Sequence, residues 1–199
     1  MSMMKSAPAD PPEVIELFEA IAKLFPTAGG FEGVVVRSVG IKYATKNDFY
    51  SGAGAAKTGG RWNRVGLEAV YASLDVTTAT QEAYQDFIYR GLSMMAISPR
   101  VTAGAKVDLT KVLDLTDATV RKRIGFTQRE LVEEDWRSLQ KAGEEAWTQA
   151  VGRGCYLANF EDLIVPSARR KVGKNIVVFP IRLAKIGKIE VLGVDQLPK

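Results

Sequence analysis

Apolar residues recur along this chain in short runs that predict helices and strands in mixed order. Between residues 12 and 24 they repeat with the 3.6-residue period of an amphipathic helix, which Pro26 ends. Nearly continuous apolar runs predict strands at residues 31–39, 69–73, 163–166, 175–181 and 188–194. Because helices do not alternate strictly with these strands, the pattern favours an α+β fold over a doubly wound one. We predict a compact mixed or antiparallel sheet core with flanking helices.

The remaining segments complete this arrangement. One helix is expected to start at Thr77 or Thr78, either of which can cap it, and to stop at Gly91. Further helices are expected at residues 127–139 and 142–151, and further strands at residues 93–101, 107–109 and 112–115. Residues 47–60 are rich in glycine and are predicted to form a loop.

Composition limits the class of protein. A chain of 199 residues, 46% of them hydrophobic, can bury a sizeable core and is most simply one domain, with or without a terminal extension. Residues 1–12 do not resemble a signal peptide, and no apolar run reaches the roughly 18 residues that span a bilayer. We therefore expect a cytoplasmic protein that makes no membrane contact. Cys155 is the single cysteine, so an internal disulfide and a cysteine-cluster metal site are excluded.

The chain contains no histidine, which removes several kinds of catalysis. Serine–histidine–aspartate and cysteine–histidine triads are excluded, and so are histidine-based zinc sites. Acid–base and electrostatic work in an enzyme would fall to Glu, Asp, Tyr, Ser, Lys and Arg. The formal charge of +4 comes from 27 cationic and 23 anionic residues spread along the chain. Such a balance is typical of a solvated surface, so we expect no direct contact with nucleic acid.

The run Gly59-Gly60-Arg61-Trp62-Asn63, followed by Gly66, is the most specific motif. Glycines let backbone amides approach a ligand, although a glycine-rich run by itself is more often a flexible turn. Arg61 offers a donor fork for phosphate oxygens, Trp62 is expected to pack, and Asn63 is expected to bond the backbone and hold the loop. This order of groups suits a flexible phosphate-bearing ligand with a flat ring, such as NAD.

Three residues on the predicted strands are further candidates. Arg37 follows the apolar run at residues 34–36, so we expect its guanidinium at a strand terminus; a phosphate ligand and an ordinary surface arginine both remain open. Tyr71 and Ser73 share one face of their strand. That face can line a cleft, or Tyr71 can be a core tyrosine.

Glu82 and Ser167 complete the candidate set. Glu82 lies near the start of a predicted helix, where a carboxylate is often only a surface residue favoured by the helix dipole. In a cleft, the same carboxylate would stabilise the oxocarbenium-like centre that forms when the nicotinamide–ribose bond breaks. Ser167 follows a strand that Pro166 ends, and it can present its hydroxyl at the sheet end or cap a turn.

Taken together, these motifs resemble the signature of RES-domain toxins, which are named for an Arg, a Glu and a Ser. Arg37, Glu82 and Ser167 match the three in order, and Val165-Pro166-Ser167-Ala168-Arg169 is a close match. The resemblance implies a fold similar to ADP-ribosyltransferases, NAD as substrate, no metal, and catalytic roles for these three residues, with Ser167 orienting Glu82 or a ribose hydroxyl. It also implies an NAD pocket, formed by Arg37, Tyr43, Arg61, Tyr71, Ser73 and Asn175. The family usually has an aromatic residue after its Arg, where this chain has Ser38; Tyr43 can substitute for it from the loop.

The resemblance covers residues 34–180, so we expect an N-terminal helical extension at residues 1–30 and the RES domain at residues 31–199. It implies a toxin that cleaves NAD and transfers ADP-ribose to a protein, water or phosphate. It also implies a cognate Xre-like antitoxin with a helix-turn-helix. Two alternatives stay open: a nucleotide-binding module without turnover, and a toxin that acts on nucleic acid, such as a ribonuclease.

Overall fold

The computed structural model describes residues 10–89, 91, 99–183 and 188–198, and within them six strands form one sheet. The strands are β1 (Gly29–Gly40), β2 (Val70–Ser73), β3 (Arg100–Asp114), β4 (Asp162–Pro166), β5 (Lys174–Val178) and β6 (Lys188–Val191). Their order is β1-β2-β5-β4-β3-β6, and β1 also pairs with β3. The first five therefore close into a ring, with β6 added outside on β3. The pairing is antiparallel except between β3 and β4, which confirms the predicted α+β fold with a mixed sheet.

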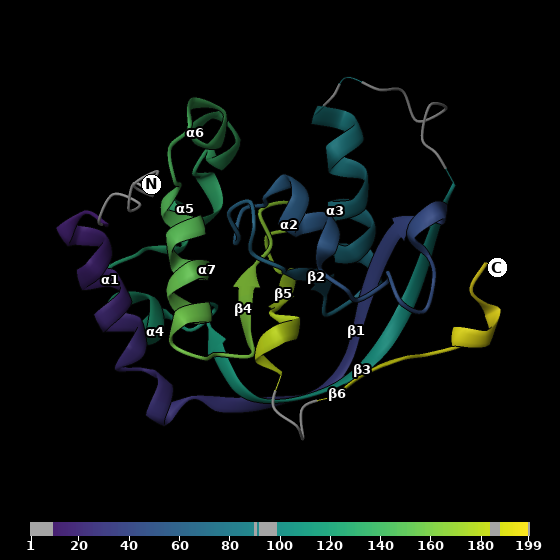
Figure 1. Cartoon of the computed structure of the whole chain (residues 1–199), viewed down its shortest axis with the longest axis horizontal. Coiled ribbons are helices and arrows are strands. Elements are labelled where there is room, and N and C mark those ends of the chain that lie inside the picture. Colours follow the sequence, from purple (N-terminus) through teal and green to yellow (C-terminus); the bar gives the residue numbers. More distant parts are fainter. Residues whose placement is uncertain (1–9, 90, 92–98, 184–187, 199) are drawn as a thin grey trace, which may run out of the picture.

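Helices flank this sheet in two groups (Figure 1). They are α1 (Pro12–Ala22), α2 (Ala53–Thr58), α3 (Val76–Tyr89), α4 (Ala118–Arg123), α5 (Gln128–Glu133), α6 (Trp136–Ala142) and α7 (Trp147–Leu157). Figure 1 shows α1 and α4–α7 on one side of β4 and β5, with α3 on the other. Within the residues described, no helix has both the length and the apolar character needed to span a bilayer.

The largest apolar core lies between α1, α7 and one face of the sheet. Leu17 and Ile21 of α1 are buried there beside Val151 and Cys155 of α7. The amphipathic period that predicts α1 thus places its apolar face inside the main core. The domain boundary expected at residue 30 falls inside β1.

The structure corrects several predicted elements in the first half of the chain. The predicted loop at residues 47–60 contains α2, which begins after Gly52 at a positive φ of 75°. Helix α3 is capped by Asp75 rather than by a threonine, since its carboxylate accepts the backbone N–H of Thr78 at 2.9 Å. Arg37 lies inside β1, opposite Ala103, and not at a strand terminus.

Other corrections fall in the second half. The strands predicted at 93–101, 107–109 and 112–115 are one long strand, β3, while residues 93–98 lie outside the described residues. The helix predicted at 127–139 is two helices, because Glu134 is extended (ψ 128°) and Asp135 caps a new one. The helix predicted from residue 142 begins only at Trp147, because Gly143 ends α6 with a positive φ of 83°.

Candidate active site

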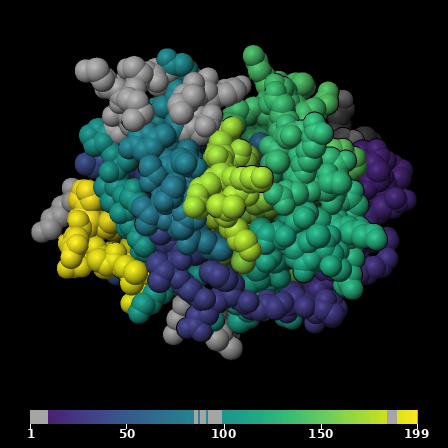
Figure 2. Space-filling model, turned by 180° about the vertical axis from the view of Figure 1, so that it is seen from behind, coloured from purple at the N-terminus to yellow at the C-terminus, as the bar shows by residue number. Residues whose placement is uncertain are grey.

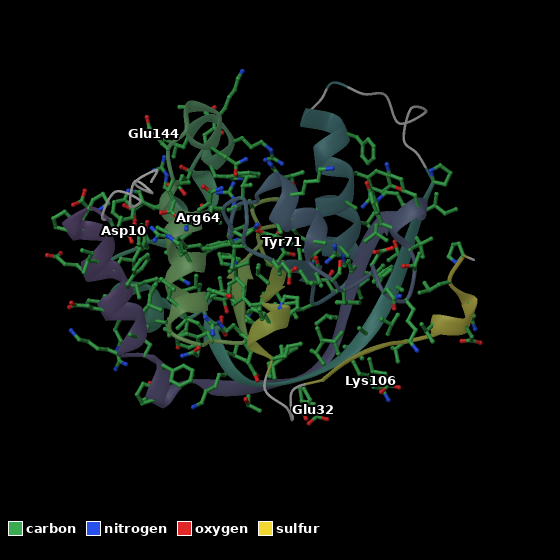
Figure 3. All side chains as sticks on the ribbon, viewed as in Figure 1. Asp10, Glu32, Arg64, Tyr71, Lys106 and Glu144 are labelled. Carbon is green, nitrogen blue, oxygen red and sulfur yellow. The ribbon has the colours of Figure 1, made fainter. Side chains whose placement is uncertain are left out.

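A cleft of about 800 Å³ opens where the two groups of helices meet the sheet. Its walls come from β1 and β2, from α2, α3 and α6, from the glycine-rich loop, and from the segment that follows β4. Tyr71, which lines it, lies near the middle of the molecule between the two groups of helices (Figure 3). Viewed from behind, the chain near residue 170 lies at the surface against the residues of α3 (Figure 2).

Glu82, which lines this cleft, contacts Ser167, although the two residues lie 85 positions apart. The Ser167 hydroxyl donates to Oε1 of Glu82 at 2.6 Å. Asn175 of β5 donates its amide Nδ2 to the same oxygen at 2.7 Å. The second turn of α3 carries Glu82, and the ends of β4 and β5 carry the two donors. The ends of β4 and β5 therefore fix one oxygen of a carboxylate that α3 carries and that lines the cleft.

Ser167 is itself held by the turn that follows β4. Its Oγ accepts the backbone N–H groups of Arg169 and Arg170 at 3.0 and 3.1 Å. Arg170 in turn reaches Asp75, the cap of α3, at 3.0 Å. Both interpretations of the sequence are therefore correct, because Ser167 caps a turn and also binds Glu82. A hydroxyl that accepts two N–H groups and gives its proton to a carboxylate is a poor nucleophile.

Arg37 projects from β1 into a buried position beside the ring of Tyr50. Its guanidinium carbon lies 5.9 Å from the centroid of that ring. Its Nη1 atom is buried without a hydrogen-bond partner among the described residues. Burial lowers the pKa of Arg37 to about 10, so the group stays charged at neutral pH. A buried cationic donor without an acceptor is costly, and an oxyanion in the cleft would satisfy it.

Ser38, the residue after Arg37, holds a second cation beside it. Arg100 of β3 donates Nε to the Ser38 hydroxyl at 3.0 Å and Nη2 to the Ser38 carbonyl at 2.7 Å. Arg100 and Arg37 both line the cleft, and their mutual repulsion further lowers the pKa of Arg37. Ser38 therefore binds a guanidinium group through both its hydroxyl and its carbonyl oxygen.

Part of the Arg61 guanidinium donates hydrogen bonds to the protein backbone. Its Nη1 donates to the carbonyl oxygens of Leu131 and Glu134, each at 3.0 Å. Burial is the main reason that its pKa is lowered, and the repulsion of Arg137 and Arg169 adds to this. Arg61 therefore ties the glycine-rich loop to the end of α5 while it also lines the cleft.

The glycine-rich loop is fixed by bonds between its own residues and β2. Asn63 donates Nδ2 to the carbonyl oxygens of Ala55 at 2.9 Å and Leu67 at 2.9 Å, which confirms its predicted role in holding the loop. The Tyr71 hydroxyl accepts the Trp62 N–H at 2.9 Å and donates to Asn63 Oδ1 at 2.8 Å. Burial raises the pKa of that hydroxyl. Only the ring of Tyr71 is left to face a ligand.

Trp62 packs as expected, and one close approach depends on a glycine. Trp62 is 3% exposed and belongs to the main core. A Cβ atom at Gly152 of α7 would collide with the carbonyl group of Trp62. Helix and loop are therefore in contact backbone to backbone, and Gly152 is needed for that contact.

The structure does not bring Tyr43 to the cleft. Tyr43 is 54% exposed, and the ammonium group of Lys42 lies 4.8 Å from its ring centroid. The aromatic residue beside Arg37 is Tyr50 instead. Tyr50 was missed because it lies in an irregular segment, where neither periodicity nor a motif distinguishes one tyrosine from another.

Sequence reasoning also missed most of the positive charge. Among the described residues that line the cleft, six are cationic and Glu82 is the one carboxylate. The cations are Arg37, Arg61, Arg100, Arg137, Lys141 and Arg169. Only two were predicted, because the other four come from separate elements and form no run in the sequence. No group of three or more described acidic or cysteine side chains is placed to hold a metal ion.

Comparison with known proteins agrees with these motifs. The family model for the RES domain matches residues 34–198. This chain belongs to the RES-domain family. Within the family, the chain is 29% identical over 143 residues to a probable NAD(+) phosphorylase of Mycobacterium tuberculosis. That alignment covers 71% of this RES-domain chain and 64% of the relative, so less than two thirds of the relative's length is represented.

The fold of this RES-domain protein is also found among solved structures. It superposes on a chain of the crystal structure of the M. tuberculosis MbcT–MbcA toxin–antitoxin complex with a TM-score of 0.66. The match covers 88% of this chain and 90% of the other at 23% identity. At that level of identity the likeness concerns the fold.

Proposed function

We propose that this RES-domain protein is the toxin of a bacterial toxin–antitoxin pair and cleaves NAD at the bond between nicotinamide and ribose. The observation that carries the proposal is the placement of Glu82 in one cleft with several guanidinium groups. The cations suit the pyrophosphate of NAD, and the carboxylate suits the positive charge that develops on the ribose. The similarity to a probable NAD(+) phosphorylase supports the same substrate.

The chemistry needs few protein groups. A nucleophile attacks C1′ of the nicotinamide ribose, and the electron pair of the C–N bond leaves with nicotinamide, which departs as a neutral base. No general acid has to protonate the leaving group, which is consistent with a chain without histidine. Glu82 opposes the oxocarbenium charge in the transition state. Ser167 orients Glu82, and Arg37 binds the pyrophosphate.

For the acceptor of ADP-ribose we favour inorganic phosphate. Besides Arg37 and Arg61, the cleft is lined by Lys141 and Arg169, which can attract a second anion next to the pyrophosphate. Arg137 and Arg169 lie near Arg61, as their effect on its pKa indicates, and Glu82 lies close enough to raise that pKa. A phosphate ion held by these guanidinium groups would stand beside the reacting carbon and carry a nucleophilic oxygen. The phosphorylase relative supports this choice over water or a protein acceptor.

The decisive experiment follows nicotinamide release and product mass. Purified protein is incubated with NAD in a phosphate-free buffer and in the same buffer with inorganic phosphate. We expect release to depend on phosphate and ADP-ribose 1″-phosphate to appear. Free ADP-ribose in both buffers would indicate water as acceptor. ADP-ribose attached to proteins after incubation with NAD and cell extract would indicate transfer to a protein. Tight NAD binding without nicotinamide release would contradict the enzyme and favour a binding module.

The toxin role predicts a partner. We propose a cognate antitoxin with a helix-turn-helix region, which neutralises this chain by covering the cleft; the similarity in fold to a chain of a toxin–antitoxin complex supports it. Co-expression with the protein encoded beside it should give a stable complex with lower NAD consumption. Fully active, unbound toxin from such cells would count against the idea.

A further inference from the structure

Asn175 lies between two partners that lock its side chain. Its Nδ2 donates to Oε1 of Glu82 at 2.7 Å, and its Oδ1 lies 2.7 Å from the hydroxyl of Ser73. Ser73 and Asn175 are paired neighbours on β2 and β5, and Ser73 is 3% exposed. Both polar ends of the Asn175 amide are therefore occupied by protein groups.

Chemistry fixes the direction of every bond in this chain of residues. An ionised carboxylate only accepts hydrogen bonds, so the amide nitrogen of Asn175 must face Glu82. The amide oxygen then faces Ser73, whose hydroxyl must donate its proton. Ser73, Asn175 and Glu82 thus form one directed relay from the sheet to the carboxylate, in which no member can turn around without losing a bond.

The relay acts on one oxygen of Glu82. Oε1 accepts from both Asn175 and Ser167, whereas Oε2 accepts no hydrogen bond from the described residues. Because Glu82 lines the cleft, Oε2 is the oxygen open to a ligand. Two donors on one oxygen also set the plane of the carboxylate, which a single donor would leave free to rotate.

We propose that Ser73 and Asn175 are positioning residues, which together with Ser167 hold Oε1 of Glu82 so that Oε2 faces the reacting ribose of the substrate. This inference rests on the proposed cleavage of NAD and gives the two residues a different task from direct contact with NAD. Asn175 acts through Glu82, and Ser73 acts through Asn175. Loss of either residue should therefore reduce turnover and not NAD binding.

Steady-state kinetics of nicotinamide release test this order. In Asn175→Ala, we expect kcat to fall about tenfold to a hundredfold, as for loss of a hydrogen bond to a charged group, while the KM for NAD stays near the parent value. In Ser73→Ala, kcat should fall less, because Asn175 remains but can rotate. Ser73→Thr keeps the hydroxyl and should restore most of the activity. An unchanged kcat in both alanine variants, or a raised KM with an intact kcat, would overturn the proposal.

A matched control separates positioning from stability. Thr116 lies outside the cleft lining and donates its hydroxyl to Asp114 at 2.6 Å, so it too makes a bond from a hydroxyl to a carboxylate. Thr116→Val should lower the melting temperature and leave kcat at the parent value. If Thr116→Val lost as much kcat as Asn175→Ala at equal loss of stability, the effect at Asn175 would be structural and the proposal would be wrong.

A second measurement does not need activity. Urea unfolding of the Asn175→Ala, Glu82→Ala and double variants forms a double-mutant cycle, in which each single change removes the bond between the two side chains. Coupling between the two changes is expected if Asn175 holds Glu82, and strict additivity would overturn the relay. Coupling in a protein that releases no nicotinamide would refute the proposed function while leaving the relay intact.

Discussion

Arg61 and Glu134 are joined through the backbone, since Nη1 of Arg61 donates to the carbonyl oxygen of Glu134 at 3.0 Å. The carboxylate of the same glutamate accepts the backbone N–H groups of Trp147 and Thr148 at 2.7 and 2.8 Å. Glu134 thus connects the glycine-rich loop to the start of α7. Arg61 is for this reason part of the scaffold of the cleft as well as part of its wall.

Arg61→Ala should therefore affect both stability and substrate binding. Two carbonyl oxygens would lose their donor, and an unsatisfied buried acceptor costs about 1–3 kcal/mol. We expect a lower free energy of unfolding in urea together with a higher KM for NAD. Arg61→Lys should recover little of either, because an ammonium group cannot reproduce the planar fork. A variant with parent stability would show that these two bonds contribute nothing.

Arg37→Ala should behave differently, although both residues were predicted to bind the pyrophosphate. Its buried Nη1 has no partner among the described residues, so its removal takes no bond from that atom. We expect stability to be unchanged or higher, and NAD binding to weaken by about 1.5–3 kcal/mol, as for loss of a hydrogen bond to a charged group. Calorimetric titration with NAD checks the affinity. Equal affinity in parent and variant would remove pyrophosphate binding from the role of Arg37.

Glu82→Gln should reduce nicotinamide release by roughly two to three orders of magnitude. The change removes the charge that opposes the oxocarbenium, an electrostatic contribution of about 2.7–4 kcal/mol. The amide oxygen of Gln can still accept from Ser167 and Asn175, so the melting temperature should change little. Growth inhibition in an expressing bacterium should disappear with the activity. A variant that consumes NAD near the parent rate would leave Glu82 as an ordinary helix residue.

Asp162 should make the free energy of unfolding of this protein fall as the pH rises above about 5. Burial raises the pKa of the Asp162 carboxyl well above its usual value, and Glu161 and Asp114 raise it further. Neither of its oxygens has a hydrogen-bond partner among the described residues. The folded state thus keeps a proton that the unfolded state releases near pH 4. The stability that this protonated carboxyl contributes is complete below about pH 4. It is lost as the pH rises toward the pKa of Asp162 in the folded state.

Unfolding in urea at a series of pH values from 5 to 8 measures this effect. The free energy of unfolding of the parent should fall across that range, and Asp162→Asn should flatten the slope, because the amide does not titrate. Carboxylates with lowered pKa values, such as Asp10 and Asp75, change stability at lower pH and do not disturb the comparison. Parallel curves for parent and variant would show that Asp162 is not the group responsible.

The sequence predicted those parts of the cleft that follow from patterns of residues along the chain. Strand alternation placed Tyr71 and Ser73 on one face, and both line the cleft. The order of Arg37, Glu82 and Ser167 was recognisable as a pattern, and the structure brings Glu82 and Ser167 into direct contact. What could not be predicted is contact across the sheet. Nothing near Asn175 in the sequence indicates that its amide spans from Ser73 to Glu82.

The prediction of helices from the sequence failed where capping residues interrupt a helical period. The helical spacing from 127 to 139 is real, but Thr127 with Glu130 and Asp135 with Ser138 each cap a separate short helix. The resulting break exposes the carbonyl oxygens that Arg61 binds. A single unbroken helix would have used some of these acceptors internally. The error in secondary structure and the missed role of Arg61 thus have one cause.

The packing of α1 has a practical consequence for anyone who would shorten this chain. The family is recognised from residue 34, but Leu17 and Ile21 fill the core against α7, and Arg153 of α7 binds Asp10 at 2.7 Å. A fragment cut at the start of the family match would leave one side of α7 as a bare apolar surface, prone to self-association. For this protein, the stretch that identifies its relatives is shorter than the stretch that builds its main core.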